Sequence, residues 1–258
     1  MNKQDKGKGG RGIEWTDYTW NPVAGCKHAC RWTMPDGSVA KCYAEEVAEG
    51  IAQSAYPLGF AHHYWKPALL AEPYRLKTPS RIFMDSMSDL MGHWVPDEQI
   101  QSVLDACAAA PWHTFQLLTK NAPRLLKFTF PTNVWVGVSA PPTEFMGKPL
   151  SAQQQERYMF RALDVFPEIR ASVRWMSIEP LSFDMAATFR RWGGYVPLHW
   201  AVIGAASNGR TLYQPRREWV SDLLTLLDRE GTAVFFKGNL DWPRAEWRES
   251  FPLEEPQS

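Results

Sequence analysis

VWVGVS, residues 134–139, is a run of apolar and β-branched residues that ends on a serine. It lacks the alternation of polar and apolar residues that marks a half-exposed strand, so it predicts a strand buried on both faces. Similar runs occur five more times along the chain: RIFM (81–84), TFQLL (114–118), VRWMSI (173–178), HWAVI (199–203) and AVFF (233–236). Strands of this kind are typical of a parallel sheet covered by helices.

Segments with helical spacing of apolar residues lie between these runs. The clearest are residues 97–110, 151–166 and 216–230, and another begins at Cys42 and runs to residue 53. The second of them opens with a serine and a glutamine at the spacing of a capping box. Strands that alternate with helices indicate an α/β domain in which crossover helices connect parallel strands.

Composition and charge narrow the class of protein. With 258 residues and 45% hydrophobic content, the chain can bury one large core, and we expect a single domain over residues 13–248. We expect residues 1–12 to form a disordered basic arm and residues 249–258 a tail.

The formal charge of +0 gives no sign of a nucleic-acid or membrane surface. No apolar run approaches the roughly 18 residues of a membrane helix, and the N-terminus lacks the apolar core of a signal peptide. We therefore expect a soluble, cytoplasmic protein.

Polar residues follow each predicted strand at once. Because the carboxyl ends of parallel strands share one rim, these residues should converge on one site although they are far apart in sequence. Any single cluster taken alone is equally consistent with an ordinary turn. The candidate ligands on this rim are Ser86, Ser88, Lys120, Ser139, Glu179 and Lys237.

Three of the four cysteines lie in one short segment, GCKHACRWTMPDGSVAKCYAE (25–45), after the expected first strand. Thiolates of Cys26, Cys30 and Cys42 could hold three corners of a [4Fe–4S] cluster and leave one iron open for another ligand. A structural zinc site with His28 as the fourth ligand is an alternative, and a redox-active dithiol is a third interpretation. Cys107 lies among alanines in a helical segment, the usual place for a small buried thiol.

The cysteine loop and the strand runs together resemble the radical S-adenosylmethionine (SAM) superfamily, whose members carry a CxxxCxxC loop after the first strand of a partial (β/α)6 TIM-like barrel. The chain is more closely similar to a phage-associated family of three-cysteine-motif proteins of unassigned activity. The blocks that carry this resemblance are IEWTDYTWNPVAGC (13–26), SRIFMDSMSDL (80–90), HTFQLLTKNAPRL (113–125), NVWVGVS (133–139), VRWMSIEPL (173–181), WAVIGAASN (200–208) and VFFKGN (234–239).

The resemblance implies an enzyme with a [4Fe–4S] cluster that binds SAM through the open iron. An external electron donor would reduce the cluster, and SAM would be cleaved to a 5′-deoxyadenosyl radical. The substrate would be unidentified, with nucleotides or nucleic acids as the class that a phage association favours. The implied contacts are Ser86 and Ser88 to the SAM amino group, Lys120 or Lys237 to its carboxylate, Ser139 and Glu179 to hydroxyl groups, and Tyr43 to the adenine.

Two departures from the superfamily pattern stand out. Residues 31–41 separate Cys30 from Cys42 where two residues are usual, and Lys41 replaces the aromatic residue that commonly precedes the third cysteine. Pro35, Asp36 and Gly37 at the centre of this insertion predict a hairpin or a looped-out turn. The turn at residues 204–208 also differs from related sequences. The longer gap between Cys30 and Cys42 favours the competing hypothesis, a non-catalytic binding module stabilised by zinc or an inert cluster.

Overall fold

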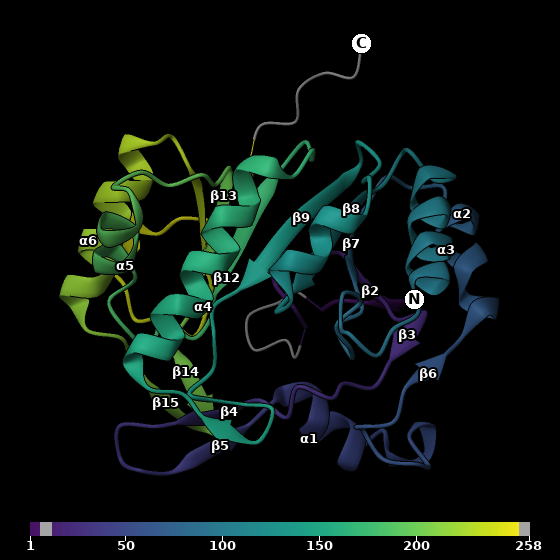
Figure 1. The fold of residues 1–258 in the computed structure, drawn as a ribbon, viewed down its shortest axis with the longest axis horizontal. Coiled ribbons are helices and arrows are strands. Elements are labelled where there is room, and N and C mark those ends of the chain that lie inside the picture. Colours follow the sequence, from purple (N-terminus) through teal and green to yellow (C-terminus); the bar gives the residue numbers. More distant parts are fainter. Residues whose placement is uncertain (6–11, 253–258) are drawn as a thin grey trace.

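The computed structural model describes residues 1–5 and 12–252, and its main element is an open eight-stranded sheet (Figure 1). Seven of the strands run parallel, and β1 pairs antiparallel with β2 at one edge. In spatial order the strands are β1 (Asn2–Lys3), β2 (Tyr18–Trp20), β7 (Arg81–Met84), β8 (Thr114–Thr119), β9 (Val134–Ser139), β12 (Arg174–Ile178), β13 (Trp200–Ile203) and β16 (Ala233–Phe236). The prediction of a single α/β domain built on parallel strands, as in a partial TIM-like barrel, is confirmed, with one parallel strand more than six.

Helices connect the parallel strands and cover the outer face of the sheet (Figure 1). The four segments predicted as helices are present, and two further helices, α2 and α5, were not predicted. Both hydrogen bonds of the capping box between Ser151 and Gln154 form at the start of α4. The helices are α1 (Tyr43–Glu49), α2 (Glu72–Arg75), α3 (Asp97–Ala108), α4 (Ala152–Val165), α5 (Met185–Trp192) and α6 (Arg217–Arg229). The 3₁₀ helices are η1 (Gln53–Ala55), η2 (Pro67–Ala71), η3 (Ala122–Lys127), η4 (Phe166–Glu168) and η5 (Arg244–Glu246).

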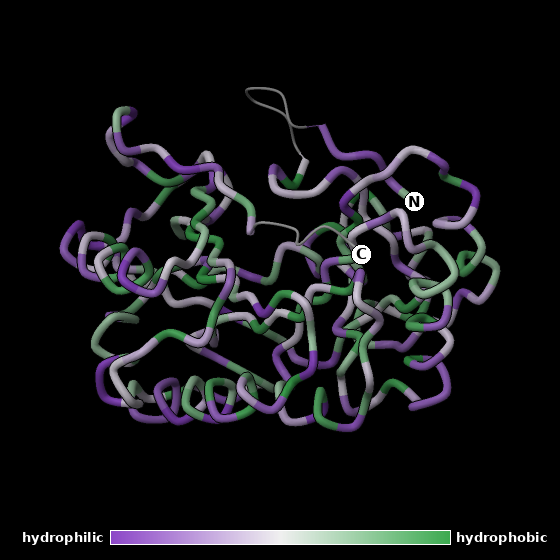
Figure 2. Tube along the Cα trace, turned by 90° about the horizontal axis from the view of Figure 1, so that it is seen from above, coloured by the Kyte–Doolittle hydropathy of each residue, from purple (hydrophilic) through white to green (hydrophobic). Residues whose placement is uncertain are grey.

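Two apolar clusters fill the two faces of the sheet. The larger cluster lies between the sheet and the helices, whereas a smaller one on the inner face is built around four indoles. Seen from above in Figure 2, hydrophilic segments lie mainly on the outer turns of the chain. The indoles of Trp15, Trp135, Trp175 and Trp200 pack against one another in edge or tilted geometry, with ring centroids 5.0–5.9 Å apart.

The two-residue period of a strand explains where the inner face changes from apolar to polar. On β12, Trp175 belongs to the inner cluster, Ser177 lies two residues further on, and Glu179 follows just past the strand. On β9 the same face carries Trp135, then a glycine, then Ser139. The indoles therefore close the base of the partial barrel, and polar groups line its rim.

Short antiparallel elements surround the rim at the carboxyl ends of the strands. Figure 1 shows α1 and the two hairpins β4–β5 and β14–β15 along this lower edge of the sheet. The remaining short strands are β3 (Val23–Ala24), β4 (Arg31–Thr33), β5 (Val39–Lys41), β6 (Tyr64–Trp65), β10 (Glu144–Phe145), β11 (Lys148–Pro149), β14 (Ala206–Asn208) and β15 (Thr211–Tyr213). The predicted hairpin in the insertion is present as β4–β5, and β10 extends it on one side.

The described parts of both chain ends contact the sheet or the helices beside it. In the arm expected to be disordered, Asn2 and Lys3 pair with β2, and the terminal ammonium bonds to Glu72. In the expected tail, the backbone N–H of Ser250 bonds to β16 and Phe251 packs on Trp200. Residues 6–11 and 253–258, which complete the two predicted segments, lie outside the described residues. Within the described ranges, no helix is long and apolar enough to cross a membrane.

Candidate active site at the carboxyl ends of the strands

A cavity of about 480 Å³ lies at the carboxyl ends of the parallel strands. Its wall includes the last residue of β9 and residues that follow β7, β8, β12, β13 and β16, together with the cysteine loop and the β4–β5 hairpin. Every candidate ligand predicted from the sequence lines this one cavity: Cys26, Cys30, Cys42, Tyr43, Ser86, Ser88, Lys120, Ser139, Glu179 and Lys237. The shared rim of a parallel sheet accounts for this convergence of residues that are more than 200 positions apart in sequence.

The backbone of the cysteine loop is fixed tightly to the rim. Gly25 has φ +84°, and a Cβ at this position would lie 1.8 Å from the carbonyl oxygen of His62, so only glycine fits. The N–H of Gly25 donates to the carbonyl of Met87 (2.9 Å), and the Ser88 hydroxyl donates to the carbonyl of Gly25 (2.7 Å). These two bonds place Cys26 directly beside the loop that follows β7.

A buried pair, His28 and Asp89, anchors the middle of the same loop. His28 Nε2 lies 2.8 Å from Asp89 Oδ2, and the exposed fractions of the two residues are only 4%. The imidazole also packs against the rings of Trp94 and Phe145, with centroids 4.8 and 4.7 Å away. Because His28 stands between Cys26 and Cys30, this contact sets where both thiols emerge.

Asp89 is saturated with hydrogen-bond donors. Besides His28, its carboxylate accepts bonds from the Thr119 hydroxyl (2.7 Å), the Lys120 N–H (2.8 Å) and the Met91 N–H (3.0 Å). Burial alone would raise the pKa of Asp89, but the hydrogen bond and charge of His28 and the bonds from Lys120 and Thr119 hold it below its usual value. Asp89 is therefore a buried carboxylate that ties the end of β8 to the cysteine loop.

The thiols lie in a low-dielectric environment. Burial raises the pKa of Cys30 to about 12 and that of Cys26 well above its usual value. Burial alone would lower the pKa of the Lys120 ammonium, but the charges of Cys30, Cys42 and Asp89 raise it instead. A metal that binds here must displace thiol protons, and Lys120 then supplies a compensating positive charge beside the thiolates.

The serines predicted to contact a ligand are also structural. The Ser86 hydroxyl donates to Asn21 Oδ1 (3.2 Å), and that of Ser88 is bound to Gly25. Each hydroxyl oxygen keeps lone pairs with which it can accept a bond from an ammonium group. Ser139 and Ser177 are paired neighbours at the ends of β9 and β12, both 5% exposed.

Charged and aromatic candidates complete the wall. Lys237 forms an ion pair with Glu179 across the rim. Burial alone would lower the pKa of Lys237, but the charge and hydrogen bond of Glu179 raise it. Tyr43 stands at the start of α1 and is 51% exposed, so its ring is available to a ligand in the cavity.

The inserted hairpin forms part of the cavity wall. Trp32, Met34, Ala40 and Lys41 line the cavity from β4, the turn and β5. The turn is attached to the opposite β14–β15 hairpin, because the Tyr213 hydroxyl donates to Asp36 Oδ2 at 2.6 Å. The insertion therefore adds a wall beside the third cysteine and leaves that cysteine on the same cavity as the other two.

The donor set fits an iron–sulfur cluster with one open corner. Three thiols share the cavity, whereas Cys107 is fully buried on the other face of the sheet beside Met84. Across the described parts of the chain, no three histidine, cysteine or acidic side chains are arranged to hold a single metal ion. His28 directs Nε2 at Asp89, and its Nδ1 is buried without a described partner.

Several residues of the site were missed by the sequence interpretation. Asp89 and Thr119 appeared only as members of polar clusters, and Ser177 was taken as part of an apolar strand. Asn239 bonds to both the N–H (3.1 Å) and the carbonyl (2.9 Å) of Ala205 and joins the loops after β13 and β16. The period of the strand could have identified Ser177, since it lies two residues before Glu179 on the same face.

A family model covers almost the whole chain. It matches residues 10–252 and is described as protein of unknown function (DUF5131). The chain belongs to this family. Among curated proteins, none matches the chain in sequence.

Solved structures of spore photoproduct lyase have a similar fold. The complex with dinucleoside spore photoproduct gives a TM-score of 0.53 at 12% identity, over 92% of this chain and 80% of that chain. A single-substitution mutant gives 0.54 at 11% identity, with the same coverage. A double mutant with bound AdoMet and dinucleoside spore photoproduct gives 0.52 at 13% identity, over 91% and 79% of the two chains. At these identities the likeness shows that the DUF5131 chain shares the fold.

Proposed function

We propose that the chain is an iron–sulfur, radical SAM-type enzyme that acts on a nucleotide or nucleic-acid substrate. The observation that carries this proposal is the meeting of three loop cysteines with the polar strand ends in a single cavity. A protein that used its cysteines only for stability would have no need to place the ends of six other strands around them. The similar fold of spore photoproduct lyase, of which one structure holds AdoMet and a dinucleoside lesion, supports both the cofactor and the substrate class.

Cys26, Cys30 and Cys42 would hold the cluster, and its open iron would take the amino and carboxylate groups of SAM. With both bound, and with the cluster reduced by an external donor, the cluster would supply the electron that cleaves the sulfonium C–S bond of SAM to methionine and a 5′-deoxyadenosyl radical. The chain itself has to bind, orient and shield these groups from water.

The charges of the cavity match the two ends of SAM. Lys120, half-buried beside the cysteines, is placed for the SAM carboxylate, and the oxygens of Ser86 and Ser88 can accept from the N–H of its amino group. Ser139, Ser177 and the Glu179–Lys237 pair lie further along the rim, where hydroxyl groups of the ribose or of a substrate would find partners. Tyr43 is the aromatic candidate for the adenine.

Electron paramagnetic resonance of the reconstituted, dithionite-reduced protein tests this assignment. A cluster with an open iron should give a [4Fe–4S]⁺ signal whose shape changes when SAM is added. Bound zinc without iron after anaerobic reconstitution, or a cluster signal that SAM leaves unchanged, would favour the non-catalytic binding module instead.

A further inference from the structure

A second cavity, of about 450 Å³, lies next to the cysteine cavity and carries positive charge. It is formed by one face of α4, the start of η3 and the β10–β11 hairpin. Lys120 lines both cavities, and Phe145 of the second cavity packs on His28 of the first. A ligand that filled the second cavity would therefore lie beside the cysteine loop.

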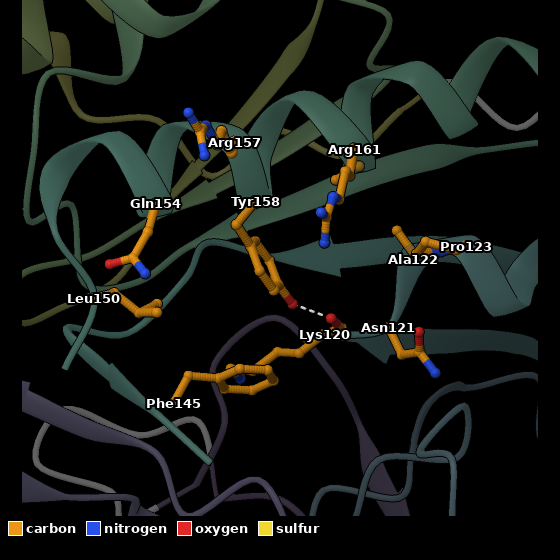
Figure 3. A pocket seen from close by; sticks show the side chains of 11 residues that line it. Lys120, Asn121, Ala122, Pro123, Phe145, Leu150, Gln154, Arg157, Tyr158 and Arg161 are labelled. Carbon is orange, nitrogen blue, oxygen red and sulfur yellow. Dashed lines mark hydrogen bonds between the residues drawn. The ribbon is translucent and has the colours of Figure 1, made fainter. Parts of the chain in front are cut away.

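Figure 3 shows the arrangement of the side chains. Tyr158 and Arg161 extend from α4 toward the segment 120–122, and the Tyr158 hydroxyl bonds to the carbonyl of Lys120. Arg157 stands one helical turn before Arg161 and also lines the cavity. Apolar side chains of Phe145, Leu150 and Pro123 form the rest of the wall.

The two arginines lack acidic partners, and the charge distribution on α4 explains why. Both acids of the helix are engaged on its other side, where Glu156 pairs with Arg191 and Asp164 accepts a bond from Trp192, both on α5. In the part of the chain that the structure describes, the side chain of neither Arg157 nor Arg161 has an ion pair or a hydrogen bond. Two arginines one turn apart thus line a cavity whose wall contains no carboxylate.

This combination points to a particular ligand chemistry. A guanidinium fork matches the oxygens of a phosphate, and the NH₂ group of the Gln154 amide adds a neutral donor on the same helix face. An apolar wall with an aromatic ring suits a base or sugar that stacks beside the phosphate. A small inorganic anion would leave this apolar wall unused.

We propose that this cavity binds the phosphodiester next to the reacting nucleotide of a single-stranded oligonucleotide. Arg161 is the principal phosphate ligand, and Arg157 provides a second positive charge. This inference rests on the proposed function for its substrate class, and it assigns to the second cavity the task of holding the strand while the neighbouring nucleotide reaches the cysteine cavity.

Fluorescence anisotropy of a short fluorescein-labelled oligonucleotide with the reconstituted full chain tests the proposal. Loss of one charged hydrogen-bonding group should raise the Kd of Arg161→Ala by about tenfold or more. The double change Arg157→Ala with Arg161→Ala should reduce the slope of log Kd against log salt concentration by about one, because it removes the contact with one phosphate. Arg161→Lys should bind with intermediate affinity, because it keeps the charge but loses the planar fork.

Arg190→Ala is the matched control, because Arg190 is on α5 and pairs with Asp222, away from the cavity. Its Kd should equal that of the unchanged protein. DNA and RNA probes of the same sequence show which sugar is preferred. Inorganic phosphate, added as a competitor at low millimolar concentration, should displace neither probe. Equal affinity of Arg161→Ala and Arg190→Ala, or no binding by the unchanged chain, overturns the proposal. Cleavage of SAM is measured separately, without an oligonucleotide. A failure of oligonucleotide binding can therefore be distinguished from a failure of the proposed radical SAM activity.

Discussion

His28 Nε2 lies 2.8 Å from Asp89 Oδ2 in a buried contact that joins the cysteine loop to the carboxyl ends of β7 and β8. The two residues are 61 positions apart, so the contact exists only in the folded chain. The same segment is also attached by the bond from the Cys26 N–H to the carbonyl of Phe60 (2.8 Å) and by the bond from the Met146 N–H to the carbonyl of His28 (2.6 Å). The pair therefore orients the thiols while leaving them free for a metal.

Asp89→Asn should weaken both the fold and the metal site. Asparagine replaces one acceptor oxygen by an NH₂ group and faces donors that the carboxylate satisfied, so we expect a loss of about 1.5–3 kcal/mol in the free energy of unfolding. Urea denaturation measures this loss, and iron per chain after reconstitution should fall as well. Asp105→Asn, on the exposed side of α3, is the control and should change neither quantity.

Iron content should distinguish the four cysteines. Replacing Cys26, Cys30 or Cys42 by alanine removes a cluster ligand, so reconstituted protein should lose most of the about four irons expected per chain. Cys107→Ala should retain them, because Cys107 is buried on the opposite face of the sheet. An iron content that depends on Cys107, or that survives loss of Cys42, would contradict the assignment of the ligands.

Gly137→Ala tests the packing at the base of the cavity. A Cβ at position 137 would lie 2.3 Å from the indole of Trp175, which is fully buried. Neither the Trp175 ring nor strand β9 can move freely. We therefore expect overpacking to lower the free energy of unfolding by about 1–3 kcal/mol. Thermal unfolding should show a lower Tm for this variant, and an unchanged Tm would show that the indole cluster is looser than described.

The inserted hairpin should contribute to SAM affinity through its attachment to β14–β15. Tyr213→Phe removes the hydroxyl that bonds to Asp36 and so detaches the turn of the inserted hairpin from β14–β15. Anaerobic calorimetry should therefore show a raised SAM Kd, with unchanged iron content. Tyr195→Phe, on an exposed ring that packs on Trp192, should behave like the unchanged chain. Tighter SAM binding by Tyr213→Phe would mean that the hairpin obstructs the cavity.

Strands and helices were predictable because they follow local periodicity. Apolar runs such as residues 134–138 marked the buried strands, and the Ser151–Gln154 capping box marked the start of α4. The turn residues at 35–37 likewise predicted the hairpin. The two-residue strands β10 and β11 carry too few residues for a recognisable pattern, and their pairing with β4 depends on distant contacts.

The sequence predicted which residues line the candidate site, but not which of them would bond to one another. The rule that parallel strands share a rim brought together residues as distant as Cys26 and Lys237. It could not show that Asp89 would pair with His28, because that choice depends on how the loop folds over the rim. The arginine face of α4 escaped notice for a similar reason, since a charged face is usually solvated and only the neighbouring β10–β11 hairpin turns it into a cavity.

The most direct test of the central claim is the formation of 5′-deoxyadenosine from SAM by the reconstituted chain under strictly anaerobic, dithionite-reducing conditions, measured by liquid chromatography and mass spectrometry. We expect slow formation of 5′-deoxyadenosine and methionine even without the substrate, and none with Cys42→Ala. A protein that carries a full complement of iron and binds SAM, yet forms no 5′-deoxyadenosine, would contradict this claim.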